Sequence, residues 1–537
     1  MVTGVSPRLF HARKIIAQNG SPDRETEAFV TLGERIVATG GFDEVRRRFP
    51  TAEIVNLEGV VVPGFNDAHA HLSIAAEDVL HLDLSPKAVG SLAALTTKVR
   101  EQAARTPPGT WIRGSRYDDA KMAEGRVLER ADLDAAASDH PALILHVAGH
   151  WGVVNSRALA LGGIDESTQA PEGGAYGRDA AGRLNGILYE RALFEFAYPS
   201  VAHGPTVAPA STLEERLRGL GMAQAMFHAA GITSLGDALC GPRDLELLRE
   251  SYRRGVLTLR VSALIAIDHY DAMRGAGIGT GFGDDRLRIG GFKAFVDGAI
   301  GGRTCLLEEP FEGTEDRGMQ TTPTPELREI VRKAQEDGER VCVHCNGDAA
   351  LRILLNQFEA AAIESPRPGL RHRIEHCSVV NETIVERIKR LEAYPVPFAG
   401  YIAYHGHNLA YWYGDARLER MFAHAWFQRE GVPVAGSSDY PCGPLEPLYG
   451  MQSMVTRRGD DGALLGTSQK IDAQSALSVY TLGSAAAEEH PAKGRLAPGY
   501  LADFVVLDDD PTTVDPSRIA HVPVRATYVG AERVFAA

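Results

Sequence analysis

The middle of the chain alternates short apolar runs with amphipathic helical patterns, and this alternation restricts the fold more than any other feature. Helical patterns such as TPELREIVRKAQEDG and NETIVERIKRLEA separate most of the runs. Repeated strand–helix units are typical of parallel strands closed into a barrel. The predicted strands after the first are 231–238, 259–267, 287–298, 340–345, 372–377, 396–404 (VPFAGYIAY) and 432–439 (VPVAGSSD).

With a first strand at 59–71, these runs number eight and predict an α/β fold of the (β/α)8 TIM type. The two ends of the chain look alike and differ from the middle. Residues 8–62 and 493–537 alternate short β-patterned runs with glycine-marked turns, which indicates antiparallel strands. We therefore expect a small β-sandwich formed by both termini (1–62 and 481–537) beside a barrel over 63–480.

The first and second predicted strands are separated by about 160 residues, whereas one βα unit needs about 30. The helical patterns SLAALTTKVREQAA and LEERLRGLGMAQAMFHAAG are assigned to the barrel. The remainder, about 105–212, predicts an insertion after strand 1. Loops at the catalytic face of a barrel shape substrate pockets, so we expect this insertion to cover that face.

Charge and composition restrict the partners. The chain of 537 residues has 56 Lys and Arg against 70 Asp and Glu, a net charge of −14, which argues against a nucleic-acid or anionic-membrane partner. It has no run of ~18 apolar residues and no signal-like N-terminus, and its six cysteines are scattered rather than arranged as a disulfide framework. These features predict a cytoplasmic protein with a small-molecule substrate, and a homodimer is left open.

The motif VVPGFNDAHAHL ends an apolar run with two histidines, His69 and His71. Residues i and i+2 of a strand point to the same face, so both imidazoles can reach one metal ion. An isolated pair of this kind would favour two unrelated histidines. It is not isolated, because His344, His376 and Asp439 each end a predicted strand, where the active sites of barrels lie. Their joint placement predicts a metal site.

The chain resembles the amidohydrolase superfamily, in particular its amidohydrolase-3 branch, which includes N-substituted formamide deformylases and many uncharacterised hydrolases. In this superfamily the metal ligands come from strands 1, 4, 5, 6 and 8, which agrees with the order of the predicted strands. The resemblance covers nearly the whole chain and rests on PGFNDAHAH, GHWGVVNSRALALGGI (149–164), KAFVDGAIGGRT (293–304), HCNGDAA (344–350), RIEHC (373–377), GSSDYP (436–441) and GYLADFVVLD.

The resemblance implies two divalent metal ions, of which zinc suits imidazole and carboxylate ligands best. One ion would be held by His69, His71 and Asp439, and the other by His344 and His376. Lys293 would bridge them as a carboxylated lysine, because a free ammonium has no lone pair to offer a metal. If Lys293 instead forms a buried salt bridge with Asp297, a single metal ion remains.

The same resemblance implies hydrolysis of a C–N bond, in an amide, formamide, carbamate or cyclic amide, by attack of a metal-bound hydroxide. Asp439 would accept the proton on attack and pass it to the leaving nitrogen. A deaminase of the same fold is the alternative, although such enzymes place a Glu three residues after the strand-5 His, where this chain has Gly347. A non-catalytic metal-binding relative is the third hypothesis, although every ligand position is filled.

Substrate contacts are less well defined by the sequence, and packing or exposure explains each candidate equally well. Cys345 and Cys377 each follow a histidine ligand, and strand alternation turns them away from the metals into the core. The candidates for the substrate pocket are Tyr117, His150, Trp151, Arg303, Tyr404 and His405.

Overall fold

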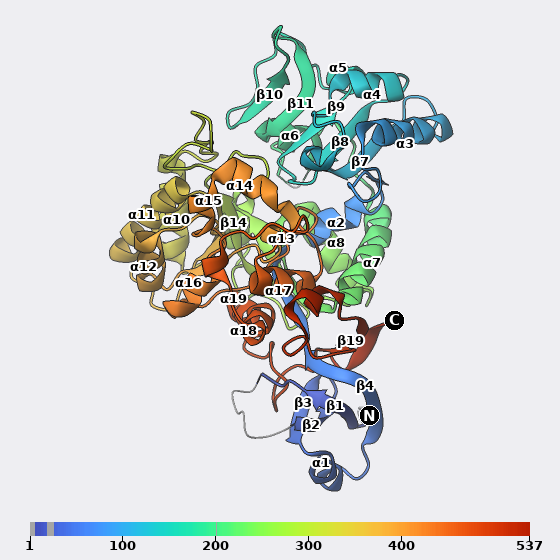
Figure 1. Cartoon of the computed structure of the whole chain (residues 1–537), viewed down its shortest axis with the longest axis vertical. Coiled ribbons are helices and arrows are strands. Elements are labelled where there is room, and N and C mark those ends of the chain that lie inside the picture. The colour runs from blue at the N-terminus through green and yellow to red at the C-terminus, as the bar shows by residue number, and fades with distance from the viewer. Residues whose placement is uncertain (1–5, 19–25, 200) are drawn as a thin grey trace.

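The computed structural model describes residues 6–18, 26–199 and 201–537, so parts of the expected range 1–62 lie outside the described residues. Its three parts follow one another along the long axis (Figure 1). The barrel lies in the middle, the inserted subdomain lies at one end, and a β-domain made from both termini lies at the other. The metal-ligand candidates all belong to the barrel.

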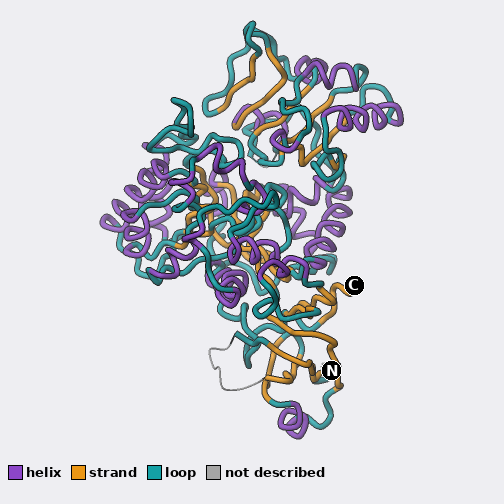
Figure 2. The backbone as a smooth tube through the Cα atoms, viewed as in Figure 1, coloured by secondary structure: helices purple, strands orange, loops and turns teal. Residues whose placement is uncertain are grey.

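The barrel is built on a parallel sheet in the order β17-β16-β15-β14-β13-β12-β5. Figure 2 shows these strands at the centre of the molecule with helices around them. The largest hydrophobic cluster fills the space between strands and helices, as expected for strands buried on both faces. The strands are β5 (Phe65–Ala70), β12 (Ile232–Cys240), β13 (Arg260–Ala266), β14 (Leu287–Phe295), β15 (Val341–Cys345), β16 (Arg373–His376) and β17 (Tyr394–Val396).

The predicted eighth strand, VPVAGSSD, closes the ring as an irregular segment. On one side the Ala435 amide donates to the Pro395 carbonyl of β17 at 3.3 Å, and the Ala399 amide donates to the Ser437 carbonyl at 3.2 Å. On the other side the Ala68 amide donates to the Gly436 carbonyl at 3.0 Å, and the Asp439 amide donates to the His69 carbonyl at 2.9 Å. The segment therefore joins the two edge strands β17 and β5.

Two predicted strands are corrected by the structure. The run 59–71 is divided at Gly64 into β4 (Glu53–Pro63), which belongs to the β-domain, and β5. A Cβ atom at Gly64 would overlap the side chain of Thr233, so the chain passes closely over β12 at this point. In VPFAGYIAY the strand ends at Val396, and helix α13 (Tyr401–His405) begins soon after, because an aromatic apolar run suits a buried helix as well as a strand.

The helices of the barrel begin and end where local signals predict. In α12 the Asn381 side chain accepts the Ile384 amide as an N-cap, and α10 is followed by Gly338 at φ 72°. No helix in the described part of the chain is both long and apolar enough to cross a membrane. The helices are α2 (Leu72–Asp78), α7 (Leu213–Ala229), α8 (Pro242–Arg253), α9 (Tyr270–Gly275), α10 (Thr324–Asp337), α11 (Asp348–Glu364), α12 (Glu382–Arg390), α13, α14 (His407–Tyr413), α15 (Asp415–Leu418), α16 (His424–Arg429), α17 (Pro447–Thr456), α18 (Ala473–Ser478) and α19 (Ser484–Ala487).

The two ends of the chain meet in one seven-stranded sheet, in the order β20-β19-β18-β4-β1-β2-β3. The sheet curls around an aromatic core in which the Phe10 ring stacks on Phe29 at 5.2 Å and Phe504 stacks on Tyr528 at 4.4 Å. Its elements are β1 (Arg8–Ile15), β2 (Thr26–Leu32), β3 (Arg35–Gly40), α1 (Phe42–Arg48), β4, β18 (Phe504–Leu507), β19 (Val524–Val529) and β20 (Glu532–Ala536).

The inserted subdomain has its own six-stranded sheet and begins earlier than residue 105. Helix α3 (Leu92–Arg105), expected in the barrel, packs Leu95 and Val99 against Ile112 of this sheet, since its apolar face matches the core of the insertion. Helix α7 does pack on the barrel. The remaining elements are β6 (Leu82–Asp83), β7 (Ile112–Tyr117), α4 (Arg130–Ala136), β8 (Ala142–His146), β9 (Trp151–Val154), α5 (Ser156–Leu161), β10 (Gly174–Arg178), β11 (Leu184–Glu190) and α6 (Arg191–Ala197).

A buried ion pair ties the barrel to the β-domain. Arg260, at the start of β13, donates to the Asp503 carboxylate at 2.7 and 3.0 Å and to Glu34 at 2.7 Å. Burial alone would raise the pKa of Asp503, but Arg260 holds it below its ordinary value. The carboxylate also accepts the Gly530 amide at 2.7 Å, so its charge is fully compensated.

Replacing Arg260 with Met should destabilise the protein by about 3–5 kcal/mol, because Asp503 would remain buried without its positively charged partner. Urea and thermal unfolding followed by circular dichroism measure the change. Arg253→Met is the matched control, because its side chain is 67% exposed and its pair with Glu250 should contribute about 0–1 kcal/mol. Equal midpoints for the two variants would contradict the prediction.

Candidate metal centre

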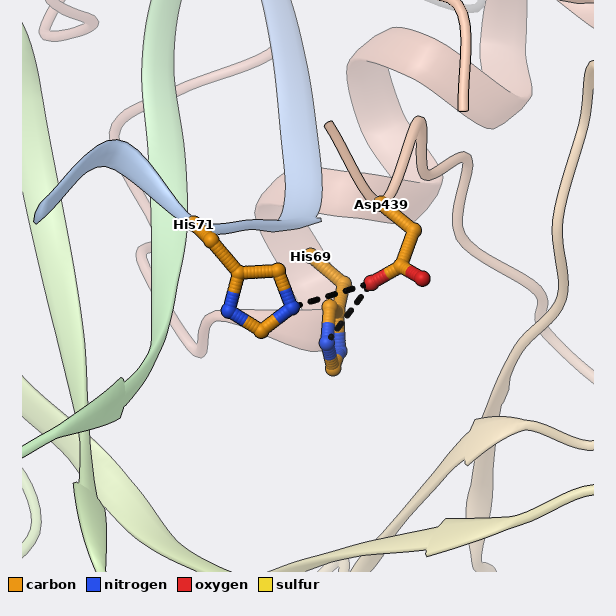
Figure 3. Close-up of side chains that lie close together, drawn as sticks. All are labelled: His69, His71 and Asp439. Atoms are coloured by element: carbon orange, nitrogen blue, oxygen red, sulfur yellow. Dashed lines mark hydrogen bonds and ion pairs between the residues drawn. The ribbon is translucent and has the colours of Figure 1, made fainter. Parts of the chain in front are cut away.

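Three side chains converge where the first and last segments of the barrel meet. His69 comes from β5, His71 directly follows that strand, and Asp439 ends the closing segment. Asp439 Oδ1 lies 3.1 Å from His71 Nε2 and 3.3 Å from His69 Nε2, as Figure 3 shows. One ligand atom from each residue lies within 4.8 Å of the others, so the three can hold one metal ion.

Both imidazoles are oriented by a second hydrogen bond. His71 Nδ1 donates to the Ala238 carbonyl at 3.1 Å, and His69 Nδ1 donates to the Glu375 carboxylate. Glu375 is held in turn by two bonds from Arg373, at 2.7 and 2.8 Å. Such partners fix the tautomer of a ligating histidine. Here they leave each Nε2 lone pair facing Asp439.

The other half of the expected ligand set lies beside this group. The His376 ring is centred 4.8 Å from His69 and 4.5 Å from His344. His344 Nε2 donates to the Gly298 carbonyl at 3.0 Å and lies 3.0 Å from Asn346 Nδ2, so among the described residues Nδ1 is the ring nitrogen without a hydrogen bond. His376 Nδ1 is buried and makes no hydrogen bond among the described residues. An orphaned buried nitrogen of this kind fits a metal ion.

The charge state of the histidines also fits a metal. Burial lowers the pKa values of His69, His344 and His376 well below the ordinary value for a histidine. The three imidazoles are therefore neutral near pH 7. Only a neutral imidazole has a lone pair for a cation. Neutral imidazoles with a carboxylate are a donor set that suits zinc and similar divalent ions.

Lys293 lies in the same group, with Nζ 3.4 Å from His69 Nε2. Burial lowers the pKa of Lys293 to about 8, although Glu375 and Asp439 favour the charged form. The alternative of a salt bridge to Asp297 is wrong. The Asp297 carboxylate instead accepts backbone amides of the 306 and 346–347 turns at 2.8–2.9 Å.

A buried carboxylate that the sequence did not single out aligns the site. Asp67 Oδ1 accepts the amides of His69 at 3.3 Å and Ser438 at 3.0 Å, and the Ser438 hydroxyl donates to Oδ2. Burial raises the pKa of Asp67 to about 7, in spite of these hydrogen bonds. Asp67 lies two residues before His69 on the same face of β5, which is the signal that could have found it.

The metal-ligand candidates line one cavity of about 60 Å³ between the barrel and the insertion. Phe295 lies on the same face of β14 as Lys293, two residues away, so strand alternation could have predicted it. The other wall residues come from helices α2 and α6, strands β7, β8 and β12 and the loops beside them, and of these the sequence singled out His150. Besides the six ligand candidates, the lining residues are Ile74, Asp78, Arg116, His146, Val147, Ala148, Gly149, His150, Phe194, Tyr198, Leu239, Phe295, Pro441 and Cys442.

Of the six predicted pocket residues, His150 lines this cavity. Burial alone would lower the pKa of His150, but the Glu190 carboxylate beside it raises the pKa above its ordinary value. Tyr117 and Trp151 lie in the core of the insertion instead. The Tyr117 hydroxyl accepts the Leu128 amide at 2.8 Å, and the Trp151 ring stacks on His146 at 4.1 Å.

The three remaining pocket candidates also lie outside the cavity. The Arg303 guanidinium lies 5.7 Å from the Trp412 ring, and the Tyr404 hydroxyl donates to Asp118 at 3.1 Å. The His405 ring is 5.8 Å from Trp412. Arg303 lies in the loop after β14, whereas Tyr404 and His405 lie on helix α13, where a strand had been expected.

The cysteines beside two ligands behave as predicted. Cys345 and Cys377 are fully buried in the hydrophobic cluster between strands and helices. All six cysteines are free and buried. These two therefore support the strands that present His344 and His376.

A profile of the amidohydrolase family matches residues 53–535, which includes the whole barrel and every ligand candidate. The chain belongs to the amidohydrolase family. Its resemblance to the amidohydrolase-3 branch is thereby confirmed.

Individual relatives agree with this assignment. The chain is 29% identical over 98% of its length to the putative amidohydrolase YtcJ of Bacillus subtilis, of which the alignment covers 99%. It is 28% identical to the N-substituted formamide deformylase of Arthrobacter pascens, with 98% and 97% of the two chains covered. An uncharacterised metal-dependent hydrolase from Pyrococcus furiosus has a similar structure, with a TM-score of 0.73 and 26% identity over 94% of this chain and 100% of that one. Together with the site, these likenesses support metal-dependent hydrolysis.

Replacing Glu375 with Gln should weaken metal binding about 10–100-fold, because His69 loses the carboxylate that orients it. Competition with a chelator measures the affinity. The substitution also removes the negative charge that pairs with Arg373, so circular dichroism checks that the variant is still folded. The control is Glu382→Gln, an exposed residue of the next helix. A folded Glu375→Gln variant with unchanged metal affinity would show that the orientation does not matter.

Proposed function

We propose that this protein hydrolyses a C–N bond other than a peptide bond, in an amide, formamide, carbamate or cyclic amide. The observation that carries the proposal is the convergence of the six ligand candidates in one cavity: His69, His71, Lys293, His344, His376 and Asp439. The likeness to a protein named as an N-substituted formamide deformylase supports the same bond class. We also propose a small-molecule substrate, because the ligand candidates lie in a cavity between the barrel and the insertion.

Two zinc ions are the proposed cofactor, with Lys293 carboxylated between them. Support comes from the buried position of Lys293 beside His69 and from its lack of an ion pair among the described residues. A pKa near 8 leaves a fraction of this amine neutral at pH 7, which is the form that can take up carbon dioxide. When bound, a divalent metal lowers the pKa of water and polarises a carbonyl group.

The residues of the chain have separate tasks in this reaction. Asp439 is the proton carrier: its carboxylate accepts the proton of the attacking water and returns it to the nitrogen as the C–N bond breaks, giving a carboxylic acid and an amine. Glu375 and the Ala238 carbonyl keep His69 and His71 in place during this exchange. Asp67 holds the Asp439 segment against β5 through Ser438.

The deaminase alternative is disfavoured by the turn after β15. The proton-shuttling glutamate expected of such enzymes would stand at position 347, which is Gly. A Cβ atom there would overlap the carbonyl oxygen of Leu306, and the Gly347 amide donates to Asp297 at 2.8 Å. No side chain fits without rebuilding this turn.

A substrate screen tests the proposed function. The zinc-loaded protein should release an amine from at least one class among formamides, N-acyl amines, carbamates and cyclic amides, measured by amine detection. The Asp439→Asn variant should lose at least about 100-fold of that rate, since it cannot carry the proton. Turnover of aminated heterocycles with release of ammonia alone would favour the deaminase. Metal binding without any turnover would favour the non-catalytic relative.

Replacing Lys293 with Ala should abolish most activity and lower the metal content from about two ions to about one per chain, because the bridging ligand is removed. Elemental analysis of the purified protein measures the content. Lys333→Ala, at a 40% exposed side chain on α10, serves as the control. One tightly held ion in both the wild type and the variant would contradict the binuclear centre and leave the hydrolase proposal intact.

A further inference from the structure

The inserted subdomain presents a hydrogen-bonded pair of side chains to the metal cavity. His150 precedes β9, and Glu190 ends β11, the neighbouring strand. The Glu190 amide donates to the His150 carbonyl at 2.7 Å, and His150 Nδ1 donates to Glu190 Oε2, also at 2.7 Å. The two residues are thus joined through both backbone and side chain.

Glu190 is fixed more firmly than a surface carboxylate. It is 3% exposed, and its second oxygen accepts the Thr304 hydroxyl of the barrel at 3.2 Å. Its backbone has a φ of 48°, a conformation that non-glycine residues adopt mainly where the surroundings enforce it. The carboxylate therefore holds His150 in one orientation relative to the barrel.

The ring of His150 lies beside His344, which with His376 forms the second expected group of metal ligands. Its centre is 5.2 Å from His344, 6.4 Å from Phe295 and 6.1 Å from Phe194. Nδ1 is engaged by Glu190, and Nε2 makes no hydrogen bond that the described residues provide. Since His150 lines the cavity, Nε2 is its one polar atom left for a ligand.

We propose that His150, with a proton on each ring nitrogen, donates from Nδ1 to Glu190 and from Nε2 to the oxygen of the scissile carbonyl group, and that Glu190 is the residue that positions it. This inference rests on the proposed function. Asp439 lies against His69 and His71, whereas His150 lies against His344, so the two side chains serve different atoms of the substrate. Negative charge develops on the carbonyl oxygen during attack, and a preorganised donor stabilises it there.

Kinetics of four variants test the proposal on whichever substrate the wild type turns over. His150→Ala should lower kcat about 100–1000-fold with little change in KM, as expected for a lost donor to a developing oxyanion. His150→Gln, whose amide nitrogen can reach the position of Nε2, should recover at least about tenfold over Ala. Glu190→Gln should fall between wild type and His150→Ala. The control His140→Gln changes another buried histidine of the insertion, bonded to the Thr110 carbonyl at 2.9 Å and outside the cavity, and should keep the wild-type kcat.

Binding of methylphosphonate, a tetrahedral oxyanion, to the metal-loaded protein gives a readout that needs no turnover. Calorimetry should show binding weakened at least about tenfold in His150→Ala, with metal content equal to wild type, and partly restored in His150→Gln. Unchanged kcat and unchanged binding in a folded His150→Ala variant would overturn the proposal, as would a wild type that does not bind the probe. If no C–N substrate is turned over, the proposed function fails, and the methylphosphonate arm still decides the role of His150.

Discussion

The closure of the barrel is the constraint on which the metal centre depends. The first strand and the closing segment are separated by more than 360 residues of chain, yet hydrogen bonds from Ala68 to Gly436 and from Asp439 to His69 make them neighbours. Asp67 adds a buried side-chain link to Ser438. Because Asp439 and the two histidines approach one another only across this seam, the metal-binding group exists only in the closed ring.

Below the ligands, the barrel interior contains charge where most barrels of this type contain branched apolar side chains. Arg373 and Glu375 are both fully buried and bonded to each other. Buried ion pairs contribute little net stability, because desolvation offsets their attraction. The pair is better explained by its effect on His69, whose orientation depends on the Glu375 carboxylate. Stability in the barrel comes mainly from the apolar layer outside the strands.

The sequence predicted the features that depend on local periodicity. Alternation placed His69 and His71 on one face, and the ends of the strands placed His344, His376 and Asp439 on one rim. It could not assign α3 to the insertion, because an amphipathic helix has the same pattern whichever core it covers. Nor could it find Glu375 as the partner of His69, since that contact joins strands 306 residues apart. The wall of the cavity combines helices, strands and loops of the barrel and the insertion, and the sequence pattern does not determine how these parts pack together, so five of the six pocket candidates lie elsewhere.

All six metal-ligand candidates belong to the barrel, while the insertion contributes His150 and Glu190. Under the proposed role of His150, the metal ligands and one substrate contact thus come from separate stretches of the chain. An insertion taken from a relative with another substrate could replace residues 82–211 without altering one ligand, provided that its own carboxylate meets the Thr304 hydroxyl. In evolutionary terms the insertion could be exchanged as a unit, and the Thr304 hydroxyl is the group of the barrel that its carboxylate must contact.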